Sequence, residues 1–378
     1  MGVNIFLPAY DVGDWLYRYI LPFVVIITPV VFFHELGHFA VARLFGVRVE
    51  TFSIGFGPAI ASWTDRKGTR WKISWIPLGG YVKFFGDLDA ASTPDRQSAE
   101  RMSEAERSVA FPFKPLYQRA LIVVAGPLAN FVLAIVVLTA FFAVFGAVTA
   151  PPLVSGIVPD SAAFAAGFKS GDKIFDIAGR HIETFDDVTA IVSMRPGESL
   201  AVSVERAGRP LLLHVTPRLT VFKDQFGEVE KVGRLGIEFR PAVVHYGPFG
   251  ALREACHATW LIVQTTLDLR TRLFTNSAAV SQLHGPIGIW KISAQVAQVS
   301  FLSLAKLAAF ISVSIGLVNL FPIPLLDGGH LLYYGIEAML GRPLGARAQD
   351  VGFRLGLAVM LGLMLLATWN DLVRLNLF

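Results

Sequence analysis

A histidine pair and a glutamate stand where an apolar segment near the start of the chain ends. His34 and His38 are four residues apart, so on an α-helix they share one face and can offer two nitrogens to one zinc ion. Glu35 would lie beside that ion, where a carboxylate can take a proton from water. Such HExxH strings also arise by chance on helix surfaces. Here the uncharged run 21–33 precedes the string, and ionisable groups at membrane depth are costly unless they pair or bind something.

A zinc hydrolase needs a third protein ligand and an open position for water. Val41 and Leu44 occupy the positions where an extended HExxH motif would carry Gly and His. Glu50 lies beyond Gly46, outside the expected helix. Asp327 is a better candidate, because it follows another apolar segment and is expected at the same membrane depth. By position alone, Asp327 is either the third ligand or a helix-terminal carboxylate that faces water.

Four apolar segments are expected to cross a lipid bilayer as helices. Arg43 and Arg48 lie at and just after the end of the first segment, so the positive-inside rule places this end, with the histidine pair, on the cytoplasmic side. The basic stretch 342–354 places the end of the third segment, and Asp327, on the same side. The four segments are residues 19–45, 121–148, 307–326 and 355–369.

The composition agrees with a membrane protein. Hydrophobic residues make up 53% of the 378 residues and charged residues only 16%, a balance that soluble domains rarely show. The net charge is +4, but the basic residues do not gather with aromatic residues, so no nucleic-acid partner is expected. A single cysteine, Cys256, excludes an internal disulfide framework.

Two polar features lie beside the expected site. Residues 47–117 contain β-like runs at 51–60, 70–76 and 81–85, with turn signals at 55–58 and 77–80. These hairpins either form a small surface sheet or offer an unpaired strand edge to an extended peptide. Asn130 lies in the second apolar segment, where it either makes a hydrogen bond between helices or belongs to the site.

Residues 151–240 read as a soluble domain on the opposite side of the membrane. Strands are expected at 153–158, 171–177, 199–206, 210–216 and 233–239, and helices at 161–168 and 185–193. This order resembles a PDZ domain in its bacterial arrangement, whose groove takes a peptide as an added strand. The groove is expected between the helix 185–193 and the strand that contains Gly156 and Ile157. A purely structural β-domain is the alternative. Residues 243–303 are amphipathic and are expected along the membrane surface.

Two motifs together resemble those of a known family. His34 to His38 and the stretch Asn319 to Gly328 resemble the paired HExxH and NxxPxPxxDG motifs of site-2 proteases, the intramembrane zinc metalloproteases. Further stretches resemble the bacterial regulator of sigma-E protease branch, namely residues 52–57, 77–83, 125–130 and 285–287. The resemblance implies one Zn²⁺ held by His34, His38 and Asp327.

The resemblance also implies roles for other residues. Glu35 is implied as the general base, and Asn319 and Asn130 as contacts to the substrate or to the reacting carbonyl. The hairpin would pair with the unwound substrate through four residues, Gly79, Gly80, Tyr81 and Val82. One departure is that the outer segment has room for about one PDZ domain, where the best-known sigma-E proteases carry two.

The expected protein is a multi-pass α-helical membrane protein with about four transmembrane helices, a cytoplasmic-side β-hairpin region and an inserted periplasmic PDZ-like α+β domain. It would reside in the bacterial inner membrane and cut transmembrane segments of single-span proteins, in envelope stress signalling such as anti-sigma factor cleavage or in clearance of signal-peptide remnants. The PDZ-like domain would bind peptides or unfolded proteins. The alternative is a non-proteolytic PDZ-containing membrane scaffold.

The expected division of the chain has seven parts. They are a first transmembrane helix (1–46), a hairpin region (47–117), a second transmembrane helix (118–149), the PDZ-like domain (150–242), a membrane-surface segment (243–303), a third transmembrane helix (304–335), and a basic loop with a fourth transmembrane helix (336–378).

Overall fold

The computed structural model divides the chain into two compact units. The first unit is Met1–Phe141 together with Leu252–Phe378, and the second is Phe142–Ala251. The described residues are 16–87, 102–182, 184–223, 229–275, 285–300 and 302–374. Five of the expected segments, 1–46, 47–117, 150–242, 243–303 and 336–378, therefore lie partly outside the described residues.

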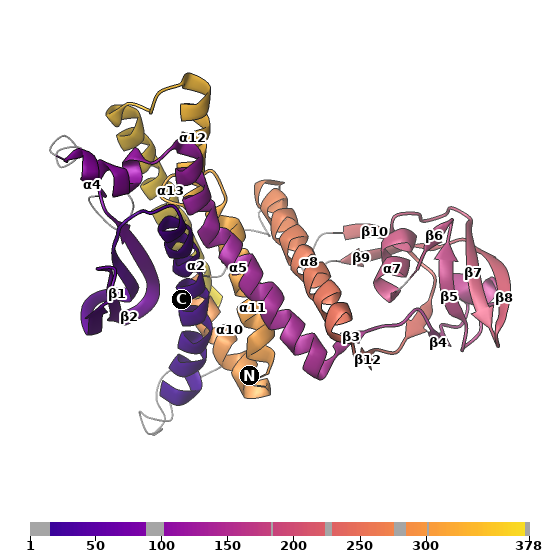
Figure 1. The fold of residues 1–378 in the computed structure, drawn as a ribbon. Coiled ribbons are helices and arrows are strands. Elements are labelled where there is room, and N and C mark those ends of the chain that lie inside the picture. Colours follow the sequence, from indigo (N-terminus) through magenta and orange to yellow (C-terminus); the bar gives the residue numbers. More distant parts are fainter. Residues whose placement is uncertain are drawn as a thin grey trace. The chain divides into compact units, whose positions relative to one another are not determined.

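Three helices in the described part of the chain are long and apolar enough to cross a membrane (Figure 1). They comprise a π-helical turn at Leu16–Ile20 that runs into α2 (Leu21–Leu44), then α5 (Leu116–Phe145) and α13 (Ala346–Arg374). A fourth apolar helix, α11 (Ser303–Asn319), has 17 residues and is about 25 Å long, short of the roughly 30 Å of a bilayer core.

The third expected span ends earlier than residue 326. Helix α11 ends at Asn319, and α12 (Asp327–Leu340) begins as a separate helix. Pro322 and Pro324 lie between them, where proline cannot donate the backbone hydrogen bond that a continuous helix needs. The break makes Asp327 the first residue of a new helix.

Two long strands, β1 (Val49–Thr64) and β2 (Arg70–Phe84), replace the three expected runs. Both strands bend. Residues 49–54 of β1 pair with residues 80–84 of β2 and, through Thr51 to Ile54, also with residues 70–73. The bends coincide with the predicted turn signals, where Gly55, Gly57 and Gly79 have positive φ values of 86°, 88° and 131°. The sequence predicted turns at these glycines, whereas the structure has bends there within two continuous strands.

The hairpin packs on α2 through an aromatic core. Phe52 is fully buried, and its ring lies 5.8 Å from that of Phe32, 5.6 Å from that of Phe39 and 4.5 Å from that of Trp71. Aromatic rings at 4.5–7 Å stabilise one another beyond the area that they bury. Figure 1 shows β1 and β2 beside α2, so the strands are fixed against the helix that carries the HExxH motif.

The remaining elements of the first unit are short or amphipathic helices. The bounds are α4 (Glu104–Val109), a 3₁₀ turn at Phe111–Phe113, α8 (Pro248–Thr275), which begins in the second unit, and α10 (Pro286–Val299). Helix α10 packs on α2 and α11 through a cluster that includes Ile26, Leu304 and Ile311.

The second unit is built of short strands and two short helices. A four-stranded sheet has the order β6-β5-β7-β8, and three two-stranded pairs accompany it: β3 with β12, β4 with β11, and β9 with β10. The bounds are β3 (Ala147–Thr149), β4 (Val154–Ile157), α6 (Ala162–Ala165), β5 (Lys173–Ile177), β6 (Arg180–His181), α7 (Phe185–Ser193), β7 (Leu200–Arg206), β8 (Arg209–Val215), β9 (Arg218–Lys223), β10 (Val229–Arg234), β11 (Ile237–Phe239) and β12 (Ala242–Val244).

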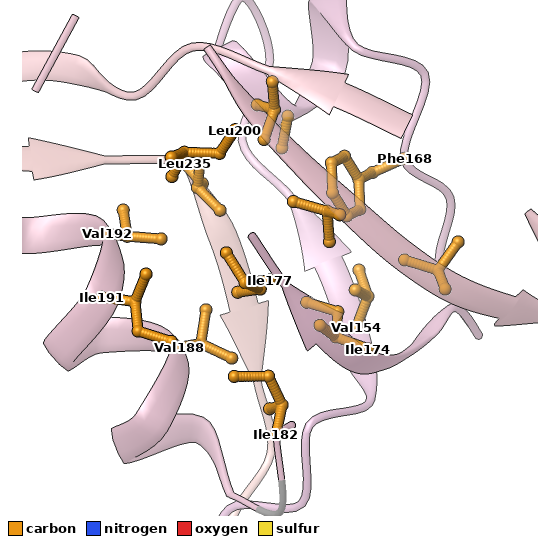
Figure 2. Close-up of a cluster of buried hydrophobic side chains, with 14 of the residues drawn as sticks. Val154, Phe168, Ile174, Ile177, Ile182, Val188, Ile191, Val192, Leu200 and Leu235 are labelled. Carbon is orange, nitrogen blue, oxygen red and sulfur yellow. The ribbon is translucent and has the colours of Figure 1, made fainter. Parts of the chain in front are cut away.

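The second unit has a hydrophobic core of its own. Figure 2 shows Val188, Ile191 and Val192 of α7 facing Ile177 and Leu200 of the sheet, all of them buried. Burying side chains of this size contributes about 1.5–3 kcal/mol each, so this core supports the unit's strands and α7 together.

Helix α7 lies against β10 and also contacts β11 through one ring pair. The rings of Phe185 in α7 and Phe239 in β11 lie 4.0 Å apart. Strand β4 pairs with β11 on one side, and on the other Val154 exchanges backbone hydrogen bonds with Gly171 and Asp172. The expected groove between α7 and the strand of Gly156 and Ile157 stays a prediction, and β11, whose Phe239 contacts Phe185 of α7, is a second strand that could line it.

Candidate metal centre

Helix α2 brings the two histidines onto one face. The Nε2 atoms of His34 and His38 lie 3.3 Å apart, and both residues are buried. The apolar sequence before them forms a continuous helix through Pro29, so the i, i+4 spacing acts as the sequence predicted.

Asp327 completes the group from the start of α12. Its Oδ2 lies 3.3 Å from His34 Nε2 and its Oδ1 lies 3.5 Å from His38 Nε2. The turn that delivers it is tightly packed, because a Cβ at Gly328 or at Gly329 would overlap the backbone of residues 320–324. Glycines after Asp327 thus let the helix start close against the preceding turn.

The three side chains fit a zinc ion. Ligand atoms held 2.0–2.2 Å from a tetrahedral ion lie about 3.3–3.6 Å from one another. The two Nε2 atoms lie 3.3 Å apart, and each lies near a different oxygen of Asp327, at 3.3 Å for His34 and 3.5 Å for His38. Oδ2 of Asp327 is buried and makes no well-aligned hydrogen bond, as expected of an atom that faces a cation. Two imidazoles and one carboxylate are also the ligand set of known catalytic zinc sites.

His38 is held from behind by α5. Its Nδ1 lies 2.9 Å from the backbone oxygen of Ile122, which can only accept, so Nδ1 carries the hydrogen and Nε2 presents its lone pair to the metal side. A Cβ at Gly126 would overlap the imidazole of His38, and one at Gly37 would overlap the backbone oxygen of Ala125. Close approach of α2 and α5 therefore depends on these two glycines.

Two asparagines flank the imidazole of His34, one at each nitrogen. Asn130 of α5 places Nδ2 3.2 Å from Nδ1 of His34, and Asn319 at the end of α11 places Nδ2 3.4 Å from Nε2. Asn319 is thus on the side of the ligand atoms, whereas Asn130 is on the far side of the ring.

Glu35 lies between the histidines and the hairpin. The backbone N–H of Val82 donates a hydrogen bond to its carboxylate, and a Cβ at Gly80 would lie 3.1 Å from its Cγ. The stretch Gly79 to Val82 therefore reaches the carboxylate that the sequence predicted as the general base.

The structure gathers most of the predicted site residues and separates two of them. Gly156 and Ile157 belong to the second unit, apart from the metal ligands. The sequence did not predict a role for the Ile122 carbonyl, and Gly126 was expected near the depth of His34 and His38 but without a packing role. The Gly-Pro pair at 126–127 was the available signal, because a small residue in an apolar helix often marks close packing.

Comparison of the sequence with known proteins gives a consistent answer. The profile described as Peptidase family M50 matches residues 22–363. A protein of Agrobacterium fabrum that bears the name of a zinc metalloprotease is 45% identical over 361 residues, which cover 94% of this chain and 95% of the relative. Metalloprotease MmpA of Caulobacter vibrioides is 41% identical over 377 residues, which cover 93% of this chain and 95% of the relative.

A solved structure is similar to a smaller part. The PDZ domain of an SdrC-like protein from Listeria monocytogenes matches 23% of this chain and 84% of its own, at 18% identity and a TM-score of 0.19, which carries no argument about fold. The family match, by contrast, covers most of the chain, and the metal-binding side chains that it requires converge. The chain belongs to peptidase family M50 and is a zinc metalloprotease.

Proposed function

We propose that this protease hydrolyses peptide bonds inside transmembrane segments of single-span membrane proteins. The observation that carries the proposal is the position of the ligands: His34 and His38 lie within the candidate span Tyr17–Leu44, and Asp327 meets them there. A bond cut by this group must reach it at membrane depth. Helices α2, α5, α11 and α13 would form four spans around it.

Each side chain of the centre has a separate task. His34, His38 and Asp327 would hold zinc, which when bound supplies Lewis-acid polarisation of water and of the peptide carbonyl. Glu35 takes the proton of the attacking water and returns it to the leaving amine. Asn319 donates through Nδ2 to the carbonyl oxygen as negative charge develops there, a contribution of about 3–4 kcal/mol where it has been measured.

The hairpin edge would hold the substrate in an extended form. Residues 80–84 pair with β1 on one side, and their other side reaches Glu35 through Val82. A helix entering the site must unwind to expose its carbonyl, and pairing with Gly79, Gly80, Tyr81 and Val82 would satisfy the backbone groups that unwinding frees.

The second unit would select or restrain substrates. In the described residues β11 pairs only with β4, so its other edge, beside α7, is open to an added peptide strand. We place this PDZ-like unit in the periplasm and the metal centre near the cytoplasmic side of the inner membrane. The matching role is regulated proteolysis, as in cleavage of an anti-sigma factor, or clearance of signal-peptide remnants.

The test is a conservative change of the base. Glu35→Gln should abolish cleavage of a single-span reporter while purified protein still binds zinc, because Gln keeps the shape of Glu35 but cannot take a proton. Glu50→Gln is the matched control: its exposed pair with Lys83, at 3.2 Å, contributes little, so cleavage should persist. Cleavage retained by Glu35→Gln would overturn the mechanism.

A further inference from the structure

Asn130 is placed to act on the metal ligand and not on the substrate. It is 0% exposed, so it presents no surface to a peptide. Its partner is Nδ1 of His34, at 3.2 Å, whereas Asp327 and His38 both approach Nε2 of the same ring. The imidazole of His34 therefore lies between Asn130 and the metal position.

Contacts between α5 and α11 fix where Asn130 stands. The hydroxyl of Ser312 donates to the backbone oxygen of Asn130 at 2.8 Å. Four residues further along α11, a Cβ at Gly316 would lie 3.2 Å from Cβ of Asn130 and 3.0 Å from the backbone oxygen of Pro127. The backbone of Asn130 is thus held by Ser312 and its Cβ lies close to α11, so rotation of the amide is the movement that these contacts leave open.

One polar atom of the Asn130 amide has a hydrogen-bond partner and the other has none among the described residues. Its Nδ2 faces His34, and its buried Oδ1 has no hydrogen-bond partner among the described residues. An amide N–H pointing at Nδ1 requires a lone pair there, which leaves the ring hydrogen on Nε2, the atom that should bind zinc. Zinc binding therefore needs the hydrogen moved to Nδ1, and an oxygen to accept it.

A half turn of the Asn130 amide supplies that oxygen. After the turn Oδ1 faces Nδ1–H, and Nε2 presents its lone pair to the metal. Amide oxygen and nitrogen have nearly the same shape, so the turn needs no repacking. An asparagine can thus serve the ring in both hydrogen arrangements, whereas a carboxylate serves only the metal-bound one and an alkyl side chain serves neither.

We propose that Asn130 is a positioning residue that holds His34 for zinc by turning its amide when the metal binds. The proposal rests on the proposed role of His34 as a ligand. It assigns Asn130 and Asn319 different tasks on one imidazole: Asn130 sets the hydrogen on Nδ1, and Asn319 faces the reacting carbonyl.

Zinc affinity of the purified full chain separates these tasks. Competition with a chromophoric chelator should show Asn130→Leu binding zinc about 10- to 100-fold more weakly, the usual loss when the partner of a histidine ligand is removed. Asn130→Asp should bind zinc at least as tightly as the wild type, because a carboxylate accepts from Nδ1–H. Asn319→Leu, the matched control, should keep wild-type zinc affinity and lose kcat.

Kinetics on a cleavable reporter give the second readout. At saturating zinc, Asn130→Leu should regain the cleavage activity of the wild type with an unchanged KM. Substitution of a residue that contacts substrate would instead raise KM at any zinc concentration. Wild-type zinc affinity in Asn130→Leu, or weakened binding in Asn130→Asp, would overturn the proposal even if one variant folds poorly. Failure of the wild type to bind zinc would instead overturn the proposed function.

Discussion

At the scale of residues, the metal centre depends on glycines that leave room for the ligands as well as on the ligands themselves. A Cβ at Gly126 would overlap three ring atoms of His38: Nε2, which would bind the ion, and its neighbours Cε1 and Cδ2. Because the Nδ1 of His38 is also held by the Ile122 carbonyl, moving the ring away from such a Cβ would break this hydrogen bond. The glycine therefore determines whether the histidine can ligate.

Gly126→Ala should weaken zinc binding by about tenfold or more, comparable to losing a group that orients a ligand. Gly335→Ala in α12 is the control, since a Cβ there meets nothing within 4 Å. That change should leave zinc affinity intact and stabilise α12 by about 0.5–1 kcal/mol. Chelator competition and thermal unfolding measure both; equal zinc affinity in the two variants would refute the steric argument.

The sequence predicted which residues form the metal centre but not how their side chains are oriented. The spacing of His34 and His38 and the family motif around Asp327 predicted which side chains would meet. It could not predict that Asn130 and Asn319 approach opposite nitrogens of one ring, because that depends on how α5 and α11 rotate against α2. Packing between helices sets this rotation, and a single sequence does not state it.

At the scale of elements, local sequence signals predicted where helices begin and end, but they did not predict which distant strands pair. Helix α7 has the predicted bounds, 185–193, because Thr184 and Asp187 form a capping box that begins it. The pairing of β11 with β4 was not predicted, because it joins segments about eighty residues apart. The break after α11 was expected from Pro322 and Pro324, yet the helix stops before both, at Asn319.

One ion pair joins the turn before β5 to the end of β7. Asp172 is fully buried and accepts from Nε and a terminal nitrogen of Arg206, each at 2.7 Å. Arg206→Gln should destabilise the second unit, by up to about 3–5 kcal/mol, because it leaves the buried carboxylate with the Lys169 backbone amide but without its paired cation. Hydrogen exchange of residues 173–204 measures this in the intact protein. Arg195→Gln, which breaks an exposed pair with Glu198 at 3.7 Å, should cost under about 1 kcal/mol.

The loss in Arg206→Gln should also depend on pH. Burial alone would raise the pKa of Asp172, but hydrogen bonds from Arg206 and from the Lys169 amide outweigh it and hold the pKa below its ordinary value of 3.8. A carboxylate with a lowered folded pKa stabilises the fold above its unfolded pKa, and this stabilisation is lost as the pH falls through the folded value. The difference between variant and wild type should therefore be largest near pH 7 and narrow below about pH 4; a constant difference would contradict it.

At the scale of the whole molecule, the metal joins distant parts of one unit only. His34 and His38 stand near the start of the chain and Asp327 near its end, with the entire second unit inserted between them. The second unit holds its own core, around Ile177, Val188 and Leu200, and none of its described residues belongs to the metal-binding group. Zinc binding should thus stabilise the fold of the first unit and leave the stability of the second unit unchanged.

Removal of zinc by a chelator should therefore loosen the chain unevenly. At a zinc concentration of 100 times Kd, binding stabilises the folded form by about 2.7 kcal/mol, and its loss should fall on α2, on the turn 320–326 and on the start of α12. Hydrogen exchange should speed up in peptides that cover 34–38 and 319–330 and stay unchanged in those that cover 174–204. Asp327→Ala, which lacks one ligand, should respond far less to chelator. Faster exchange throughout both units would show that zinc supports the second unit as well, contrary to its self-contained core.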